Sequence, residues 1–195
     1  MMSEKTWYKI NQTDNTLISN SVLKFNVKKL LKNNTDVNKL SNTWVLWCHD
    51  IKDTNWGRDS YIKVFSFNSI EDFWKLYKNL NNIDSIMLFL MKEGIFPLWE
   101  DPENKNGGCW SYKIKKKDNY NTWKHLSMSL IGNYLSQNDN IMNNINGISF
   151  NPHLYNSVIK IWSKTNEYQT NLTEFKSLDA LKLLDPIYKV HQVEY

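Results

Sequence analysis

Three tryptophans stand at positions where a flat ligand could reach them. Trp56 lies in the polar stretch DIKDTNWGRD, beside Gly57, where a core residue is unexpected. Trp99 lies in a stretch punctuated by glycine and proline and is followed by two acidic residues, and Trp162 ends the run IKIW. Loop side chains positioned by a rigid scaffold commonly form binding sites. Indoles stack well on bases, so these residues predict a site for a flat aromatic ligand.

The whole chain supports that interpretation, because nine of its 195 residues are tryptophan. A core can absorb some indoles, but each prefers a partner for its N–H group. The net charge of +4 permits an anionic partner without requiring one. Arg58 is the only arginine and asparagine is abundant, a bias that is typical of an AT-rich viral or protist genome.

Composition also limits the class of protein. A chain with 41% hydrophobic and 23% charged residues is expected to be globular, and its length suits one domain. No apolar run approaches the roughly 18 residues of a membrane helix, and the start of the chain has no signal-like apolar stretch, so a cytoplasmic protein is expected. Cys48 and Cys109 lack a CxxC spacing, which predicts neither a disulfide framework nor a zinc site. We expect no metal and no cofactor.

The elements that position the tryptophans follow from hydrophobic periodicity. Residues 43–49 and 61–67 are predicted to be strands. Ser69 begins a helix, with Asp72 three residues later in a variant of the capping box. The helix buries a stripe at i, i+3, i+4 and i+7, formed by Phe73, Leu76, Tyr77 and Leu80. Trp74 lies about 100° round from that stripe, so it is expected to be exposed.

The remaining elements complete an α+β pattern. We predict a strand or short helix at 85–91, strands at 109–116, 146–151, 157–163 and 187–195, and helices at 120–136 and 171–184. One face of the helix at 120–136 would carry Trp123, Leu126, Leu130 and Tyr134. Strands and helices mix without strict alternation, which favours a largely antiparallel sheet. Residues 1–37 are polar and are interpreted as an N-terminal extension of a single domain at 38–195.

Four segments resemble one known family in order and spacing. They are SIEDFWKLY at 69–77, GIFPLWEDPENKNGGCW at 94–110, SLIG at 129–132 and IKIW at 159–162. From Trp44 to the C-terminus the chain is similar to the translation initiation factor 4E family of cap-binding proteins, and the pattern PLWEDxxNKxGGxW is distinctive. The resemblance implies a curved, mainly antiparallel sheet of about eight strands. About three helices would cover its convex face, with the ligand pocket on the concave side.

The resemblance also implies roles for the pocket residues. Methylation at N7 gives guanine a positive charge, which adds a cation–π component to its stacking on indoles. Trp56 and Trp99 would hold the methylated base between them, and Trp162 would line the methyl group. Glu100 would accept hydrogen bonds from N1–H and the N2 amino group, which selects guanine. The backbone N–H of Trp99 would meet O6.

The phosphate contacts depart from the family pattern. Counting back from Trp162 without a gap, the positions that usually carry basic residues hold His153, Tyr155 and Val158, and Cys109 stands where an arginine is frequent. Because the chain ends at Tyr195, the C-terminal loop that approaches the phosphates is expected to be absent. The candidates to replace these contacts are His153, Tyr155, Lys160, Lys113, Lys115 and Arg58. A phosphate-facing His153 would strengthen binding when protonated.

A second surface is expected around Trp74. In the family, the corresponding tryptophan docks a helical peptide from the scaffold initiation factor or from repressors of the 4E-binding type. Ile70 lies one turn earlier on the same face. On the second helix, the positions that usually hold Leu, Glu and Leu carry Lys124, His125 and Met128, and residues 38–40 replace the usual His-Pro-Leu. The surface is therefore predicted to survive with altered specificity.

Three functions remain open at this point. The first is a cap-binding initiation factor that recruits capped mRNA through a scaffold partner. The second is a cap-binding repressor or decoy, which differs from the first at the Trp74 surface rather than in the pocket. The third is a cap hydrolase, suggested by His49 with Asp50 and by Glu100 with Asp101. The sequence has no spaced metal-ligand cluster and no Gly-rich phosphate loop, so a protein that is not an enzyme is favoured.

Overall fold

The computed structural model describes residues 19–20, 23–24, 38–80, 82–169, 175 and 186–192. Most of the predicted N-terminal extension and of the helix predicted at 171–184 lie outside the described residues, as does the end of the strand predicted at 187–195. Within these ranges no helix is long and apolar enough to cross a membrane.

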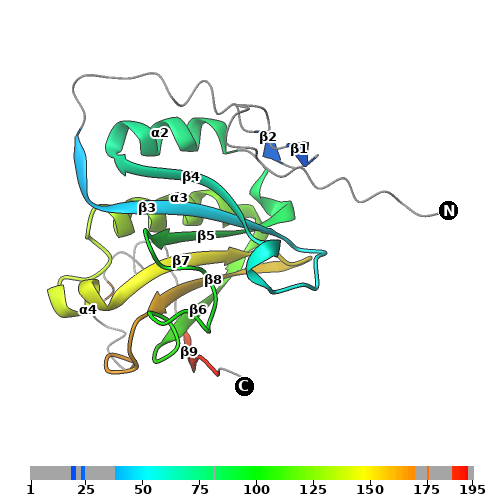
Figure 1. Cartoon of the computed structure of the whole chain (residues 1–195). Coiled ribbons are helices and arrows are strands. Elements are labelled where there is room, and N and C mark those ends of the chain that lie inside the picture. Colours follow the sequence, from blue (N-terminus) through cyan, green and yellow to red (C-terminus); the bar gives the residue numbers. More distant parts are fainter. Residues whose placement is uncertain are drawn as a thin grey trace.

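One open antiparallel sheet of seven strands organises the described part of the chain (Figure 1). Its strand order is β4-β3-β5-β7-β8-β6-β9. The strands are β3 (Lys39–Asp50), β4 (Ile62–Ser69), β5 (Ile86–Lys92), β6 (Gly108–Lys115), β7 (Ile145–Asn151), β8 (Asn156–Ser163) and β9 (Ile187–Val190). Two further short strands, β1 (Ser19–Asn20) and β2 (Leu23–Lys24), pair with each other. The predicted α+β fold with a mainly antiparallel sheet is confirmed.

Strand β5 shows how the sheet separates two apolar layers. Its run IMLFLM is buried throughout, and the side chains alternate between faces. Leu88 and Leu90 join the main core, which also contains the buried residues of the helices. Met87 and Phe89 point to the opposite face and join a smaller cluster with Trp162. The segment left open as strand or helix is therefore a central strand, buried on both faces.

Helix α2 (Ile70–Asn79) begins as predicted at Ser69, whose hydroxyl accepts the backbone N–H of Asp72 at 3.2 Å. Its interior stripe packs into the main core, whereas Trp74 is 37% exposed. Helix α3 (Asn119–Ile131) buries Trp123 against the sheet.

The predicted end of α3 at residue 136 is wrong. The helix ends at Ile131, and the next residues leave the helical conformation: Gly132 caps it and Asn133 has a φ of 53°. Tyr134, expected on the buried face, lies beyond the helix and is 64% exposed.

Short helical turns complete the fold. The helix α4 (Asp139–Asn144) was not expected from the sequence; the side chain of Asn138 caps it by accepting the backbone N–H of Asn140 at 3.0 Å. Single 3-10 turns lie at η1 (Arg58–Ser60), η2 (Ile83–Ser85) and η3 (Lys116–Asp118). The turn η1 follows the loop that carries Trp56, and α2 to α4 contribute to the core on the face of the sheet away from that loop.

Candidate functional site

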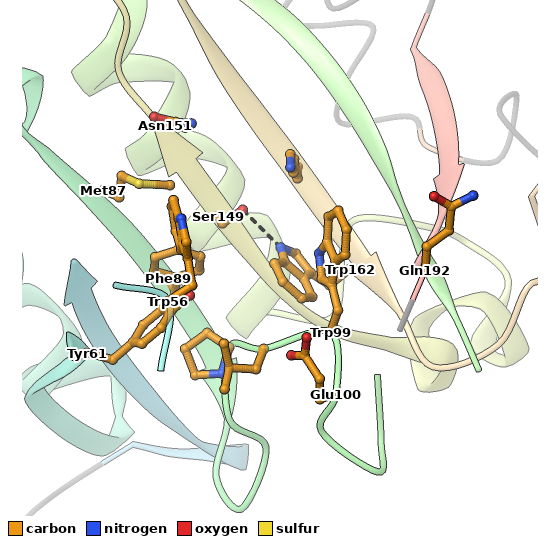
Figure 2. A pocket seen from close by; sticks show the side chains of 13 residues that line it. Trp56, Tyr61, Met87, Phe89, Trp99, Glu100, Ser149, Asn151, Trp162 and Gln192 are labelled. Carbon is orange, nitrogen blue, oxygen red and sulfur yellow. Dashed lines mark hydrogen bonds between the residues drawn. The ribbon is translucent and has the colours of Figure 1, made fainter. Parts of the chain in front are cut away.

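A pocket of about 530 Å³ opens on the sheet face that carries Met87 and Phe89. A volume of this size suits a nucleotide-sized ligand. The residues that line it are Trp56, Tyr61, Met87, Phe89, Pro97, Leu98, Trp99, Glu100, Ser149, Asn151, Lys160, Trp162 and Gln192. Figure 2 shows Trp56 on one side of this space and Trp99 with Trp162 on the other. Six separate stretches of the chain therefore meet at one site.

Short-range hydrogen bonds shape the loop that presents Trp56. The Asp53 carboxylate accepts the backbone N–H of Asn55 at 2.9 Å, and the Asn55 side chain accepts that of Gly57 at 2.8 Å. These turns are typical of Asp and Asn side chains that fold back on their own backbone. They hold the intervening indole outside the core, where it is 51% exposed.

The loop between β5 and β6 that carries Trp99 is tied by two buried side chains. The Asp101 carboxylate accepts the backbone N–H groups of Phe96 and Glu103, both at 3.0 Å. The Asn104 amide donates to the carbonyls of Phe96 and Leu98, at 2.9 and 2.8 Å. These bonds explain the sequence PLWEDPEN: its Asp and Asn fix the backbone on either side of the exposed Glu100.

Trp162 forms part of the pocket floor. It lies on β8, is 3% exposed, and its Nε1–H donates to the Ser149 hydroxyl at 2.9 Å. A buried indole N–H normally needs such a partner. Phe89 meets the Trp162 ring edge to face, with centroids 6.3 Å apart. The floor is thus buried and largely apolar.

Glu100 and Lys160 are the charged side chains among the described residues that line the pocket. The Lys160 ammonium lies 5.9 Å from the centre of the Trp99 ring. Burial raises the pKa of the Tyr61 hydroxyl, and the Glu100 carboxylate raises it further, so Tyr61 stays neutral in the pocket wall. The site therefore offers one anion and one cation around an aromatic cleft.

Three of the residues predicted to bind phosphate lie outside the tryptophan pocket. Lys113, His153 and Tyr155 line a second cavity of about 560 Å³, formed by β6, the β7–β8 turn and β9. His153 lies in the turn beyond β7, because Asn151 still pairs with Val158 at the end of the two strands.

Two further basic candidates also lie outside the pocket lining. Arg58 approaches the buried Asp101 carboxylate at 3.7 Å and lies over the Phe96 ring at 4.7 Å. Lys115 is exposed near the end of β6. Of the basic candidates, only Lys160 lines the pocket with the tryptophans.

The sequence also missed several lining residues. Asn151 and Gln192 reach the pocket from the ends of β7 and β9. Neither carries a local signal, since ordinary polar residues follow many strands. Tyr61 and Phe89 could have been found from strand alternation, once the face that carries Trp162 is known.

The second predicted surface lies on the helices. Ile70 is 43% and Trp74 37% exposed, and the Lys124 ammonium lies 5.2 Å from the centre of the Trp74 ring. Met128 is half-buried against the main core. The two exposed side chains form a small apolar patch with a cation beside it.

Within the described ranges, no cluster of three His, Cys, Asp or Glu side chains is arranged to hold a metal ion. Cys48 and Cys109 are both free and buried.

The sequence and the fold have known counterparts. A family model for eukaryotic initiation factor 4E matches residues 39–195. Eukaryotic translation initiation factor 4E of Dictyostelium discoideum is 35% identical over 135 residues, which is 65% of this chain and 52% of that protein. The Xenopus laevis protein of the same name is 30% identical over 159 residues, covering 77% of this chain and 68% of its own length.

Solved structures agree with these matches. Ascaris suum eIF4E-3 in complex with the m7G cap has a TM-score of 0.69 and 27% identity, covering 82% of this chain and 94% of that one. C. elegans eIF4E-3 with the 4E-binding protein Mextli has the same TM-score at 24% identity, a likeness of fold alone. This chain spans about half the length of several curated relatives it matches. The family model nevertheless covers the whole sheet and the pocket, and the chain belongs to the eukaryotic initiation factor 4E family.

Proposed function

We propose that this chain binds the 7-methylguanosine cap of mRNA, with the methylated base between the indoles of Trp56 and Trp99. The observation that carries the proposal is that both indoles, from loops more than 40 residues apart, line one cavity together with Glu100 and Trp162. The Ascaris relative, solved with the m7G cap, supports the same ligand.

The chemistry of the pocket suits a cationic purine. Stacking on an aromatic side chain contributes roughly 1–3 kcal/mol per base, and a positive charge adds to this. The Glu100 carboxylate can accept two hydrogen bonds from the guanine edge, which adenine cannot donate in the same pattern. Trp162 offers an apolar surface for the N7 methyl group.

Tryptophan fluorescence titration with 7-methyl-GTP and with GTP tests the proposal. We expect quenching by both nucleotides, with the methylated one binding at least tenfold more tightly. Trp56→Ala should remove most of that preference. Trp74→Ala is the matched control, since it also deletes an exposed indole but on the helical face, and it should bind like the wild type. Equal affinity for the two nucleotides would refute the proposal.

For the phosphates we propose Lys160 as the main anchor, because it is the cation among the described lining residues. Lys160→Gln should weaken binding of 7-methyl-GTP more than that of the monophosphate and should flatten its salt dependence. Lys113→Gln is the matched control, because Lys113 lines the other cavity. If Lys113→Gln has the larger effect, the phosphates run toward His153 and Tyr155 instead.

We further propose that the patch formed by Ile70, Trp74 and Met128 binds a helical segment of a scaffold initiation factor or a 4E-binding protein, and that the chain recruits capped mRNA for translation in the cytoplasm. The complex of C. elegans eIF4E-3 with Mextli and a cap analog, which is 25% identical in sequence to this chain, supports a partner of this kind. Trp74→Ala should reduce affinity for such a peptide at least tenfold, since tryptophans dominate interface hot spots. Unchanged affinity would favour the repressor or decoy alternative with a different partner.

We infer that the chain acts by binding and not by catalysis. A cap analogue incubated with the protein should be recovered intact. Its hydrolysis would favour the third alternative, a cap-processing enzyme.

A further inference from the structure

Two buried histidines lie behind the two pocket tryptophans. The His49 ring is 0% exposed and stacks on Trp56, with centroids 4.5 Å apart and planes at 1°. The His191 ring is 5% exposed and stacks on Trp99 at 5.5 Å and 12°. Neither histidine is among the residues that line the pocket, so each covers an indole face turned away from it. The site is therefore layered: imidazole, indole, open pocket, indole, imidazole.

Backbone carbonyls fix the proton on each imidazole. His49 Nε2 lies 2.8 Å from the carbonyl oxygen of Asn55, and His191 Nδ1 lies 2.8 Å from that of Asn104. A carbonyl only accepts, so these two nitrogens carry the hydrogens. The other nitrogen of each ring is buried and has no hydrogen-bond partner among the described residues. A second proton there would be a buried charge without a partner, which is costly.

We propose that His49 and His191 are positioning residues, whose rings hold Trp56 and Trp99 ready for a cationic base. The inference rests on the proposed cap-binding function. Trp56 sits half exposed in a polar loop, and without the ring behind it the indole would have to be ordered each time a ligand binds. A neutral ring also leaves the indole's π-electrons free to attract the methylated base.

The groups around His191 act on its pKa in both directions, and burial has the largest effect. Burial lowers the pKa of His191; the bond to Asn104 and the charge of Glu100 oppose this, while Lys160 acts in the same direction. The ring of Tyr61 faces His49, with centroids 4.9 Å apart, and Tyr61 stays neutral. At His191 burial outweighs the charge of Glu100, so a single proton on that ring is favoured.

Three substitutions separate the roles of the His49 ring and of its hydrogen bond. His49→Phe keeps a flat ring but loses the donor, His49→Gln keeps a donor but loses the ring, and His49→Ala loses both. The measurement is the affinity for 7-methyl-GTP, together with the melting temperature of each variant. We expect His49→Ala and His49→Gln to bind about three- to tenfold more weakly, the scale of ordering one side chain, and His49→Phe to stay within about twofold of the wild type.

The reverse pattern would overturn the inference. If His49→Gln binds like the wild type and His49→Phe does not, the histidine acts by anchoring the loop through Asn55. If affinity follows the melting temperature across all three variants, the role is only structural. His125→Ala, on the exposed face of α3, is the matched control and should change neither quantity.

His191 is tested by the pH dependence of methyl selectivity, the ratio of the affinities for 7-methyl-GTP and GTP. Protonation of His191 would place a cation behind Trp99 and weaken attraction for the charged base only. Between pH 7.5 and 5.0 the ratio should therefore fall about twofold or more in the wild type. In His191→Phe that part of the fall should be missing. The nucleotide phosphates and the N1–H of the methylated base titrate in the same way with both proteins, so they cancel in the comparison.

The outcomes distinguish this inference from the proposed function. If the wild type does not prefer 7-methyl-GTP at any pH, cap binding itself fails. A second outcome is that the wild type prefers 7-methyl-GTP while its affinity ratio changes with pH in the same way as that of His191→Phe. In that case cap binding stands and the role of His191 is refuted.

Discussion

The Asn104 side chain ties the loop that carries Trp99 to the rest of the fold, and we expect its substitution to loosen that loop. It is 0% exposed, and its side chain makes three hydrogen bonds. Two are donated to the Phe96 and Leu98 carbonyls, and the third is accepted from the Asn146 amide at 2.9 Å. Asn104→Ala deletes all three without adding bulk.

The expected cost follows from those bonds. Each of the three partner groups keeps a second hydrogen bond. The Phe96 carbonyl also accepts the N–H of Leu98, and the Leu98 carbonyl accepts that of Asp101. The Asn146 amide also donates to the Glu103 carbonyl. No group is orphaned, so the loss is the ordinary net value of about 1 kcal/mol per bond, or ~3 kcal/mol in all. For a chain of this size, that corresponds to a fall of ~6–12 °C in melting temperature.

Urea denaturation and thermal melting provide the measurement, with a 7-methyl-GTP titration below the melting temperature. We expect Asn104→Ala to lose both stability and affinity, because the loop that carries Trp99 and Glu100 loosens. Asn121→Ala, on the exposed side of α3, removes the same side chain from a surface position and should stay within about 0.5 kcal/mol of the wild type. A loss below about 1 kcal/mol in Asn104→Ala would refute the reasoning that this network holds the loop.

Three further predictions concern stability and reactivity. Ser69→Ala removes the N-cap of α2 and should lower the free energy of unfolding by ~1 kcal/mol in chemical denaturation; no change would show that the cap bond at 3.2 Å is not stabilising. Burial raises the pKa of Cys48 to about 12 and also raises that of Cys109, so mass spectrometry should detect no iodoacetamide label on the native protein at pH 8 and two labels after unfolding. Burial lowers the pKa of His191 from its ordinary value of 6.5, so the unfolded chain binds the proton first as pH falls. The free energy of unfolding should therefore drop below pH ~6.5 more steeply in the wild type than in His191→Phe, and equal slopes would contradict this.

The sequence by itself determined the features that depend on near neighbours. The cap of α2 needs only Ser69 and the backbone three residues later, and the Trp56 loop needs only Asp53 and Asn55 beside it. Strand alternation and helical periodicity likewise arise from residues a few positions apart. These local rules predicted the strands, the first helix and the exposure of Trp74.

Local rules failed where two signals compete over a few residues. The pattern of α3 continues past Ile131, but Gly132 caps the helix and Asn133 adopts the left-handed conformation that ends it. The segment 139–144 is too short for periodicity to identify, so α4 went unpredicted.

Only the tertiary structure decided which distant residues share the pocket. The pairing of Asn151 with Val158 leaves His153 in a turn and brings Asn151 into the site, and no count along the chain reveals that register. The stacking of His191 on Trp99 joins the end of β9 to the loop between β5 and β6. Such contacts depend on strand order and register, which the packing of the whole sheet selects and a single segment does not encode.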